Sequence, residues 1–125
     1  MQDEPKPAEL TTAVADFLRG EIAPVITGHA AFKLRVAINA LDLVTRQLSL
    51  QDGSDAAELH GLTLLLGVQG TLAGLNQDLA DRIAQGDVDL DTPGVKEHLW
   101  RTTLAKLAVD QPNYAAYKRE IDTKR

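Results

Sequence analysis

One long segment without glycine or proline constrains the fold of this chain more than any other feature. Residues 29–52 lack both residue types, which is the longest such stretch in the 125-residue sequence. Because glycine and proline are the residues that most weaken a helix, the segment predicts one helix of roughly 33 Å. Its apolar positions form two faces, one around Leu34 and Leu41 and another around Val36 and Leu43. A helix that is apolar on two sides is normally packed on both, so we expect it at the centre of the fold.

The composition predicts an all-α protein. Leucine and alanine supply most of the apolar residues, whereas aromatic residues make up only 4% of the chain. Leucine and alanine favour helices, while β-branched and aromatic residues favour strands. With glycine and proline as boundaries, we predict a single-domain bundle of five to six helices around the long second helix. The first predicted helix begins at residue 7 and ends between residues 20 and 24. The next five predicted helices span residues 29–52, 54–67, 71–86, 93–111 and 112–117.

The two ends of the chain are predicted to lie outside this bundle. Residues 1–6 are acidic and proline-rich, which predicts a disordered tail, and residues 118–125 form a charged C-terminal tail. The helical bundle domain is then residues 7–117, which agrees with ~100–200 residues for one domain.

Charge and composition argue against several functional classes. The 13 basic and 18 acidic residues give a net charge of −5, so a nucleic-acid-binding protein is not expected. The absence of cysteine excludes disulfides, cysteine-ligated metal sites and thiol nucleophiles. No apolar run approaches the ~18 residues of a membrane span. The N-terminus lacks the basic and then apolar pattern of a signal peptide, so we expect a cytoplasmic protein.

The acidic loop at residues 87–91 resembles the start of a calcium-binding loop, because three aspartates alternate in it. The pattern then departs from an EF-hand, since Thr92 stands where glycine is required and His98 where a bidentate glutamate is required. We therefore expect a solvated loop and no metal site. Thr92 is instead predicted to cap the next helix, with Pro93 at its first position.

The sequence predicts neither catalytic residues nor a cofactor. The three histidines lie far apart, and none has a second ligand-type residue three or four positions away. The two serines, Ser49 and Ser54, lie in no nucleophile motif. Ser54 is instead a predicted N-cap of the helix that follows it, and Thr71 is the predicted N-cap of the helix 71–86.

The first candidate binding surface is a polar stripe on the predicted helix 29–52. Its residues are Lys33, Arg35, Asn39, Asp42 and Arg46. Over residues 28–50, three cations against one anion give a local charge of +2 in an acidic chain. Guanidinium groups pair bidentately with carboxylates and phosphates, so the stripe could receive a ligand or a partner. The alternative is an internal role, in which an arginine pairs with Asp42 and the asparagine satisfies a buried turn.

A second candidate site lies where the predicted helix 93–111 ends. Asp110 and Gln111 precede Pro112, and Tyr114 follows with a ring and a polar tip. The simpler interpretation is a corner in which these polar groups bond the freed backbone groups. The alternative is that a ligand or partner uses them.

Three motifs of the chain resemble those of a known family. They are Phe32-Lys-Leu-Arg-Val-Ala37 with Asn39-Ala-Leu41, Gly70 with Leu72 and Leu75-Asn76, and Thr103-Leu-Ala-Lys-Leu-Ala-Val-Asp-Gln-Pro112 with Tyr114. The sequence resembles an uncharacterised family of small all-helical bacterial proteins, a domain of unknown function. The resemblance implies genes beside aminoglycoside-phosphotransferase-like kinases and acyl-CoA dehydrogenases. It supplies no catalytic residues.

These observations leave open several functions. The first hypothesis is a non-catalytic accessory protein in acyl-CoA or hydroxyacyl metabolism. It would dock to a phosphotransferase-like kinase, or self-associate, through an apolar helix face rimmed by Lys33, Arg35 and Arg46. The second is a helical module that binds an anionic acyl or phosphorylated metabolite, with Arg35 and Arg46 on the anion. A third, an enzyme that uses Asp42, Asp110 or a histidine, lacks any pair of groups that the sequence brings together.

Overall fold

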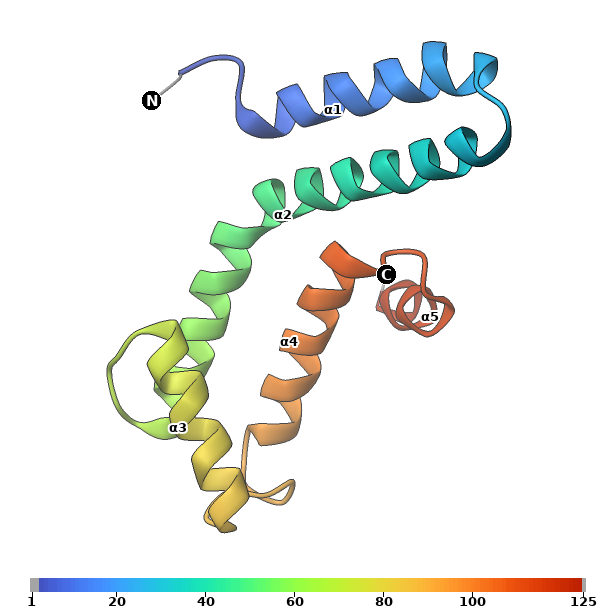
Figure 1. Ribbon diagram of the computed structural model, residues 1–125. Helices are drawn as coiled ribbons and strands as arrows, with labels where there is room; N and C mark the ends of the chain where they lie inside the picture. Colours follow the sequence, from blue (N-terminus) through green and yellow to red (C-terminus); the bar gives the residue numbers. More distant parts are fainter. Residues whose placement is uncertain (1–2, 125) are drawn as a thin grey trace. The chain divides into compact units, whose positions relative to one another are not determined.

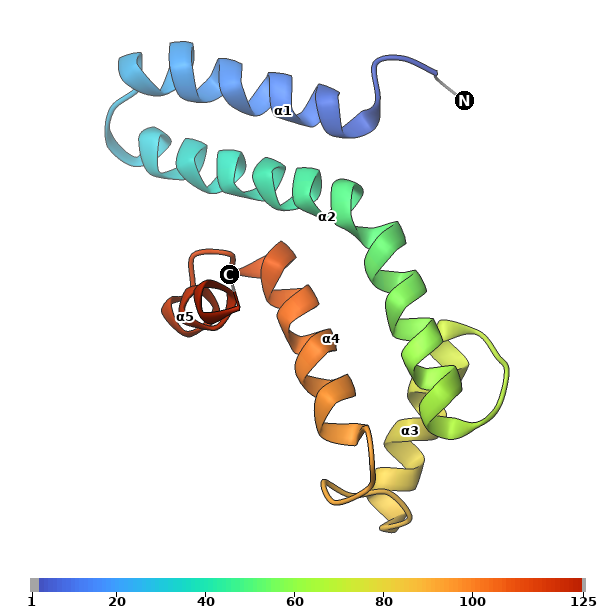
Figure 2. The ribbon, with the colours of Figure 1, turned by 180° about the vertical axis from the view of Figure 1, so that it is seen from behind.

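The computed structural model describes residues 3–124, and in this range it contains five α-helices and no strand (Figures 1 and 2). The helices are α1 (Pro7–Phe17), α2 (Gly28–Leu66), α3 (Leu72–Gln85), α4 (Val95–Asp110) and α5 (Ala115–Thr123). A π-helical turn, η1 (Leu18–Ile22), and a 3-10 turn, η2 (Ala23–Val25), follow α1. The predicted all-α class and the long central second helix are confirmed. Residues 1, 2 and 125 of the two predicted tails lie outside the described residues.

The second helix is longer than the sequence predicted. The sequence predicted a break at Gly53 and a new helix capped by Ser54, but α2 continues through both positions and spans 39 residues. Gly53 does not adopt a positive φ, so its only cost to the helix is the ~1 kcal/mol by which glycine is less favourable than alanine. A packed apolar segment on the C-terminal side, around Leu62, offsets that cost.

Contacts divide the chain into two compact units, Met1–Gln51 and Asp52–Arg125, and α2 contributes to both. The sequence analysis expected one bundle around the second helix. The lengths of the helices explain the difference, because α1 has 11 residues, α3 has 14 and α4 has 16, against 39 in α2. Each partner helix therefore covers only part of α2 at 1.5 Å per residue.

In the N-terminal unit, α1 and the first part of α2 lie side by side and run in opposite directions (Figure 1). Two polar contacts join α2 to α1 and to η1, the turn that follows α1. The hydroxyl groups of Thr11 in α1 and Thr45 are hydrogen-bonded at 2.6 Å, and Arg19 of η1 donates to Asp42 at 2.7 Å. The α-helical geometry of α1 gives way to η1 and η2 before Ile26, whose extended backbone ends the helical segment.

In the C-terminal unit, the second part of α2 packs against α3 through leucines spaced four residues apart. The buried core pairs Leu62 and Leu66 with Leu75 and Leu79. The partly buried side chains around it are Leu59, Leu65, Leu72 and Val88. The predicted cap of α3 is confirmed, because the Thr71 hydroxyl accepts a hydrogen bond from the amide of Gly74 at 3.1 Å.

The start of α4 differs from the prediction. Thr92 does not cap it, and the helix begins at Val95 after Gly94, whose φ of 86° suits glycine. The reason is a competing turn, in which the carboxylate of Asp89 accepts hydrogen bonds from the amides of Asp91 and Thr92 at 2.8 and 3.0 Å. This turn is the common way in which an aspartate bonds the backbone two or three residues ahead.

The last helix also differs from the prediction, which started it at Pro112 and ended it at Tyr117. It begins at Ala115 and runs to Thr123, so most of the expected charged tail is helical. An ion pair between Glu120 and Lys124, four residues apart and at 2.9 Å, supports this extension. The indole of Trp100 also donates to Glu120 at 3.1 Å, which fastens α5 to α4.

Candidate functional site

The predicted polar stripe lies on α2 within the N-terminal unit. Three of its side chains are exposed and have no hydrogen bond or ion pair with any of residues 3–124. These are Lys33, Arg35 and Asn39. Asp42 and Arg46 are half-buried. Asp42 accepts its hydrogen bond from Arg19, so its carboxylate ties the stripe to α1.

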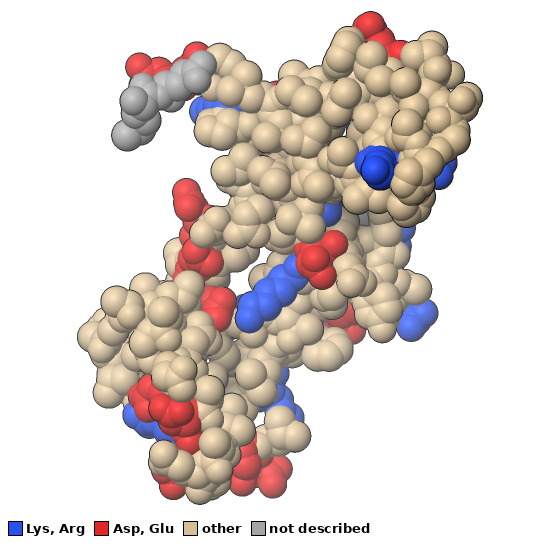
Figure 3. Space-filling model, in the orientation of Figure 1, with Lys and Arg blue, Asp and Glu red and all other residues tan. Residues whose placement is uncertain are grey.

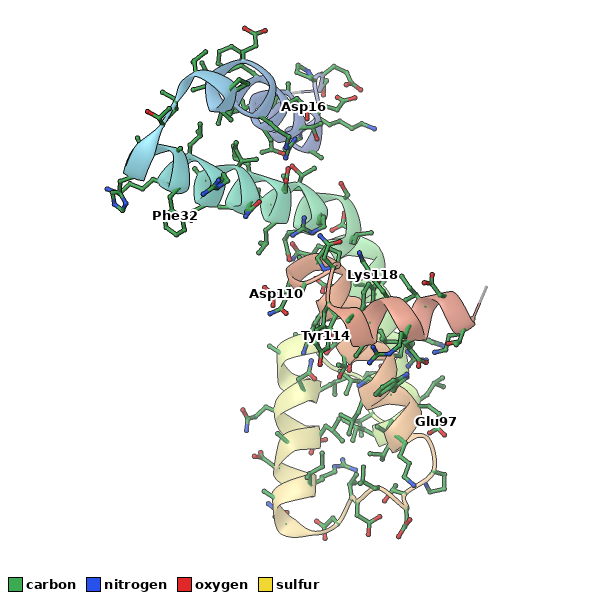
Figure 4. The ribbon with its side chains drawn as sticks, turned by 90° about the vertical axis from the view of Figure 1, so that its right-hand side faces the viewer. Asp16, Phe32, Glu97, Asp110, Tyr114 and Lys118 are labelled. Carbon is green, nitrogen blue, oxygen red and sulfur yellow. The ribbon has the colours of Figure 1, made fainter. Side chains whose placement is uncertain are left out.

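Apolar side chains surround this stripe and most of them are exposed. Among the described hydrophobic residues of the unit, only Ala15 and Ile38 are buried. The exposed large ones are Leu10, Val14, Phe17, Val25, Phe32, Val36, Val44, Leu48 and Leu50. Figure 4 shows Phe32 on the side of α2 that faces away from α1, and in Figure 3 uncharged residues cover most of this unit on the side shown. The two helices therefore present more apolar surface than they bury against each other.

The second predicted site, Asp110, Gln111 and Tyr114, forms the corner between α4 and α5 (Figure 4). All three residues are exposed. The backbone holds this corner, because the amide of Gln111 donates to Leu107 at 2.9 Å and the amide of Tyr114 donates to Gln111 at 3.0 Å. The side chains of Asp110 and Gln111 make no hydrogen bond within residues 3–124, so the structural role expected of them falls to main-chain groups.

A groove that the sequence analysis did not predict lies between α2 and α4 in the C-terminal unit, with a volume of about 420 Å³. It is lined by Gly61, Leu64, Leu65, Pro93, Gly94, Glu97, His98 and Arg101. Gly61 is central to it, because a Cβ atom there would lie 2.9 Å from Nδ1 of His98 and would collide with the guanidinium of Arg101. Glycine at this position lets both α4 side chains lie directly against the backbone of α2.

The histidine in this groove is buried and unpaired. His98 is 3% exposed, and its Nδ1 atom has no hydrogen-bond partner. Burial lowers the pKa of His98, and the nearby Arg101 lowers it further, while Glu58 acts in the opposite direction. Burial in an apolar setting disfavours the charged form, so the imidazole is held neutral.

The arginine in this groove also lacks a protein partner. Arg101 is exposed and makes no ion pair with any carboxylate of residues 3–124. Glu97 stands four residues before it on α4, at the spacing and in the order that favour a helical ion pair, and yet the two do not pair. Glu58, on the facing helix, accepts a hydrogen bond from Asn76 at 2.8 Å instead.

The sequence offered a signal for this groove that the sequence analysis did not use. Gly53, Ala57 and Gly61 recur every four residues, so small side chains share one face of α2. That face meets α4, because Gly53, Ala57, Arg101 and other residues line a further hollow of about 180 Å³ between the same helices. His98 has no ligand-type residue three or four positions away, which argued against a metal site. That spacing does not reveal whether the side chain is buried.

A third hollow, of about 410 Å³, opens on the outer side of α4. It is lined by Leu90, Lys96, Leu99, Trp100 and Thr103. Trp100 is half exposed there, and its indole nitrogen donates a hydrogen bond to the carboxylate of Glu120. The bond from Lys124 and the bond from Trp100 hold the pKa of Glu120 below its usual value, so the carboxylate stays charged and keeps α5 in place.

Residues 3–124 contain no group of three or more histidine, cysteine, aspartate or glutamate side chains arranged to hold a metal ion. None of the helices in this range combines the length and the apolar character needed to cross a membrane.

Comparison with known proteins gives one match. Residues 24–114 match the model of a protein family described as a domain of unknown function, DUF6285. The matched range contains α2, α3 and α4 and all three motifs on which the sequence resemblance rests. No curated protein and no solved structure matches the chain.

Proposed function

The chain belongs to the DUF6285 family, and we propose that it is a non-catalytic accessory protein that binds another protein through its N-terminal unit. The binding surface is the outer face of α2, defined here as Phe32, Val36 and the neighbouring cations Lys33 and Arg35. Arg46 lies on the same helix three turns further along.

One observation carries this proposal, namely the small core of the N-terminal unit. Only Ala15 and Ile38 are buried among its described hydrophobic residues, while Phe32 and Val36 are more than half exposed. Large exposed apolar surfaces on small proteins mark sites of interaction. A pair of helices with so little buried area gains stability when a partner covers the remaining face.

The charges beside this face indicate the chemistry of the partner. Lys33 and Arg35 are exposed and have no carboxylate partner within residues 3–124. Cations at the edge of an interface favour a partner surface that carries carboxylates in complementary positions. We therefore propose a partner with an apolar patch edged by acidic residues. The family resemblance favours a phosphotransferase-like kinase of acyl-CoA or hydroxyacyl metabolism as that partner.

Co-expression of the full chain with the phosphotransferase-like kinase encoded nearest to it tests the proposal. The kinase should co-elute with the wild-type chain in size-exclusion chromatography. Phe32→Ser and Arg35→Glu should each weaken the complex, because the first removes apolar contact and the second reverses a charge at its edge. Both residues are exposed, so neither change should unfold the chain.

Lys96→Glu is the matched control, because Lys96 is an exposed cation on α4 and lies in the C-terminal unit. It should leave the complex intact. Failure of the kinase to co-elute, with no change in its activity or solubility, would contradict the proposal. A dimer of the chain that Phe32→Ser disrupts would assign the face to self-association and would also contradict it.

A further inference from the structure

Two polar side chains of α4 line the groove beside Gly61 without a hydrogen-bond partner in the described chain. One is the guanidinium of Arg101, which forms no ion pair or hydrogen bond with residues 3–124. The other is the imidazole of His98, since no side-chain hydrogen bond of this residue occurs in the described chain. Buried polar groups are nearly always satisfied by protein, water or ligand. The groove therefore holds an unused donor in Arg101 and an unpaired buried imidazole in His98.

The tautomer of the neutral imidazole follows from its surroundings. A neutral imidazole carries its proton on one nitrogen only. Nδ1 faces the backbone of α2 at Gly61 and is buried there with no acceptor beside it. A proton on Nδ1 would have no acceptor, so the neutral ring carries its proton on Nε2 and Nδ1 keeps a lone pair. His98 is thus a second donor that a ligand oxygen would satisfy.

The other walls of the groove restrict the rest of the ligand. Leu64, Leu65 and Pro93 line it with apolar surface. Glu97 also lines it and adds one negative charge. Glu97 repels any bound anion, but it repels a phosphate dianion about twice as strongly as a monocarboxylate, whose single charge one guanidinium balances. The volume of about 420 Å³ is within the range of small-molecule sites.

We infer that the α2–α4 groove binds a small organic carboxylate with an apolar body, whose carboxylate accepts hydrogen bonds from Arg101 and His98. The apolar body lies along Leu64, Leu65 and Pro93. Gly61 is the residue that makes this possible, because any side chain there would push Arg101 out of the groove. This site lies in the C-terminal unit and does not depend on the partner proposed for the N-terminal unit.

Titration of the full chain with hexanoate, acetate and inorganic phosphate tests this inference. The chain is labelled with 15N in its histidine rings, and the imidazole resonances are followed by NMR. Hexanoate should shift the His98 resonances saturably and leave those of His29 and His60 unchanged. Acetate lacks the apolar body, so it should bind on the order of tenfold more weakly or worse. Phosphate should give no saturable shift at His98.

Variants of the two donors sharpen the test. Arg101→Gln should weaken hexanoate binding by about tenfold or more, as expected for loss of a charged hydrogen bond. Arg101→Lys should recover part of that loss, because it restores the charge without the fork. Arg119→Gln removes an exposed cation on α5 and should leave binding unchanged.

Three results would overturn the inference. They are the absence of a saturable His98 shift with hexanoate, wild-type affinity in Arg101→Gln, and phosphate binding as tight as that of hexanoate. Circular dichroism of each variant separates loss of binding from loss of fold, because Arg101 is exposed and its replacement should leave the helical signal intact.

Discussion

The two units of the chain differ in how much apolar side chain they bury. In the N-terminal unit the described buried hydrophobic residues are Ala15 and Ile38, and two polar contacts join α1 to α2. The C-terminal unit buries four leucines in one cluster together with Val95 of α4. Because each fully buried leucine contributes about 1.5–3 kcal/mol, most of the stability of the chain resides in residues 52–124.

Because of this difference, the two parts of α2 have different surroundings. The second part of α2 packs against α3 and α4, and its residues Gly61, Leu64 and Leu65 line a groove whose polar side chains come from α4. The first part of α2 carries exposed cations and exposed apolar residues beside a short partner helix. Ordering a residue costs about 1–2 kcal/mol of backbone entropy, which two buried side chains do not offset for a unit of this size.

Removal of a core leucine should have the largest effect. Leu62 is fully buried, and Leu62→Ala should lower the free energy of unfolding by about 2–5 kcal/mol, because it leaves a cavity in the cluster. Leu64 is two positions away on the same helix and is 72% exposed. Leu64→Ala should therefore change the free energy of unfolding by about 0.5 kcal/mol or less. Urea denaturation followed by circular dichroism measures both. Similar losses for the two variants would show that the C-terminal unit lacks a dominant core.

Two glycines of α2 should respond in opposite directions to replacement by alanine. A Cβ at Gly61 would collide with Arg101 and approach His98, so Gly61→Ala should cost about 1–3 kcal/mol. Gly53 has helical φ and no atom within 4 Å of a Cβ placed there. Gly53→Ala should therefore raise the free energy of unfolding by about 0.5–1 kcal/mol through helix propensity. Thermal melts of both variants test the pair. A stabilising Gly61→Ala would mean that α4 does not pack closely on α2.

The stability of the C-terminal unit should fall as the pH is lowered below neutrality. Burial lowers the pKa of His98 in the folded chain, so the unfolded chain takes up a proton at a higher pH than the folded chain does. The contribution of the neutral imidazole is complete above the ordinary histidine pKa of about 6.5 and is lost as the pH falls through that value toward the lower folded pKa. The slope cannot exceed about 1.4 kcal/mol per pH unit for one proton.

Urea unfolding at a series of pH values from about 7.5 to about 5.5 measures this slope, since most carboxylates titrate below that range. His98→Gln removes the titrating group and should flatten the profile. An unaltered slope in His98→Gln would show that the imidazole is not buried in the folded chain.

The sequence was sufficient to predict the fold class and most helix boundaries, for reasons that particular residues illustrate. Thr71 caps α3 as predicted, because its hydroxyl has no competing partner. Thr92 offers the same N-cap signal but does not cap α4, because its amide donates a hydrogen bond to the carboxylate of Asp89 in a turn. The helix break predicted at Gly53 does not occur for another reason. Packing around Leu62 outweighs the helix propensity of glycine, which is only ~1 kcal/mol less favourable than that of alanine.

The candidate site was less predictable because it depends on contacts between distant residues. Periodicity placed Arg35 and Asn39 on one helix face, and both are exposed there. It could not reveal that Asp42 bonds Arg19, 23 residues away on another helix. Nor could it reveal that Gly61 and His98 meet, because a lone histidine carries no spacing signal and its burial is a property of the packed helices.

The smallest predicted effect concerns the ion pair that joins η1, the turn directly after α1, to α2, and it tests the comparison of the two units most directly. Arg19 and Asp42 pair at 2.7 Å with side chains 49% and 36% exposed, so Asp42→Asn should lower the free energy of unfolding by about 0.5 kcal/mol or less. The matched control is Asp78→Asn, because Asp78 pairs with Arg82 at 2.9 Å within α3 and is 37% exposed. Both changes should have similar small effects on global stability. Only Asp42→Asn should accelerate amide hydrogen exchange in α1, because α1 has few other contacts that resist local opening. Equal exchange rates in α1 for the two variants would mean that apolar contacts hold this helix, and that the N-terminal unit is less dependent on a partner than its small core implies.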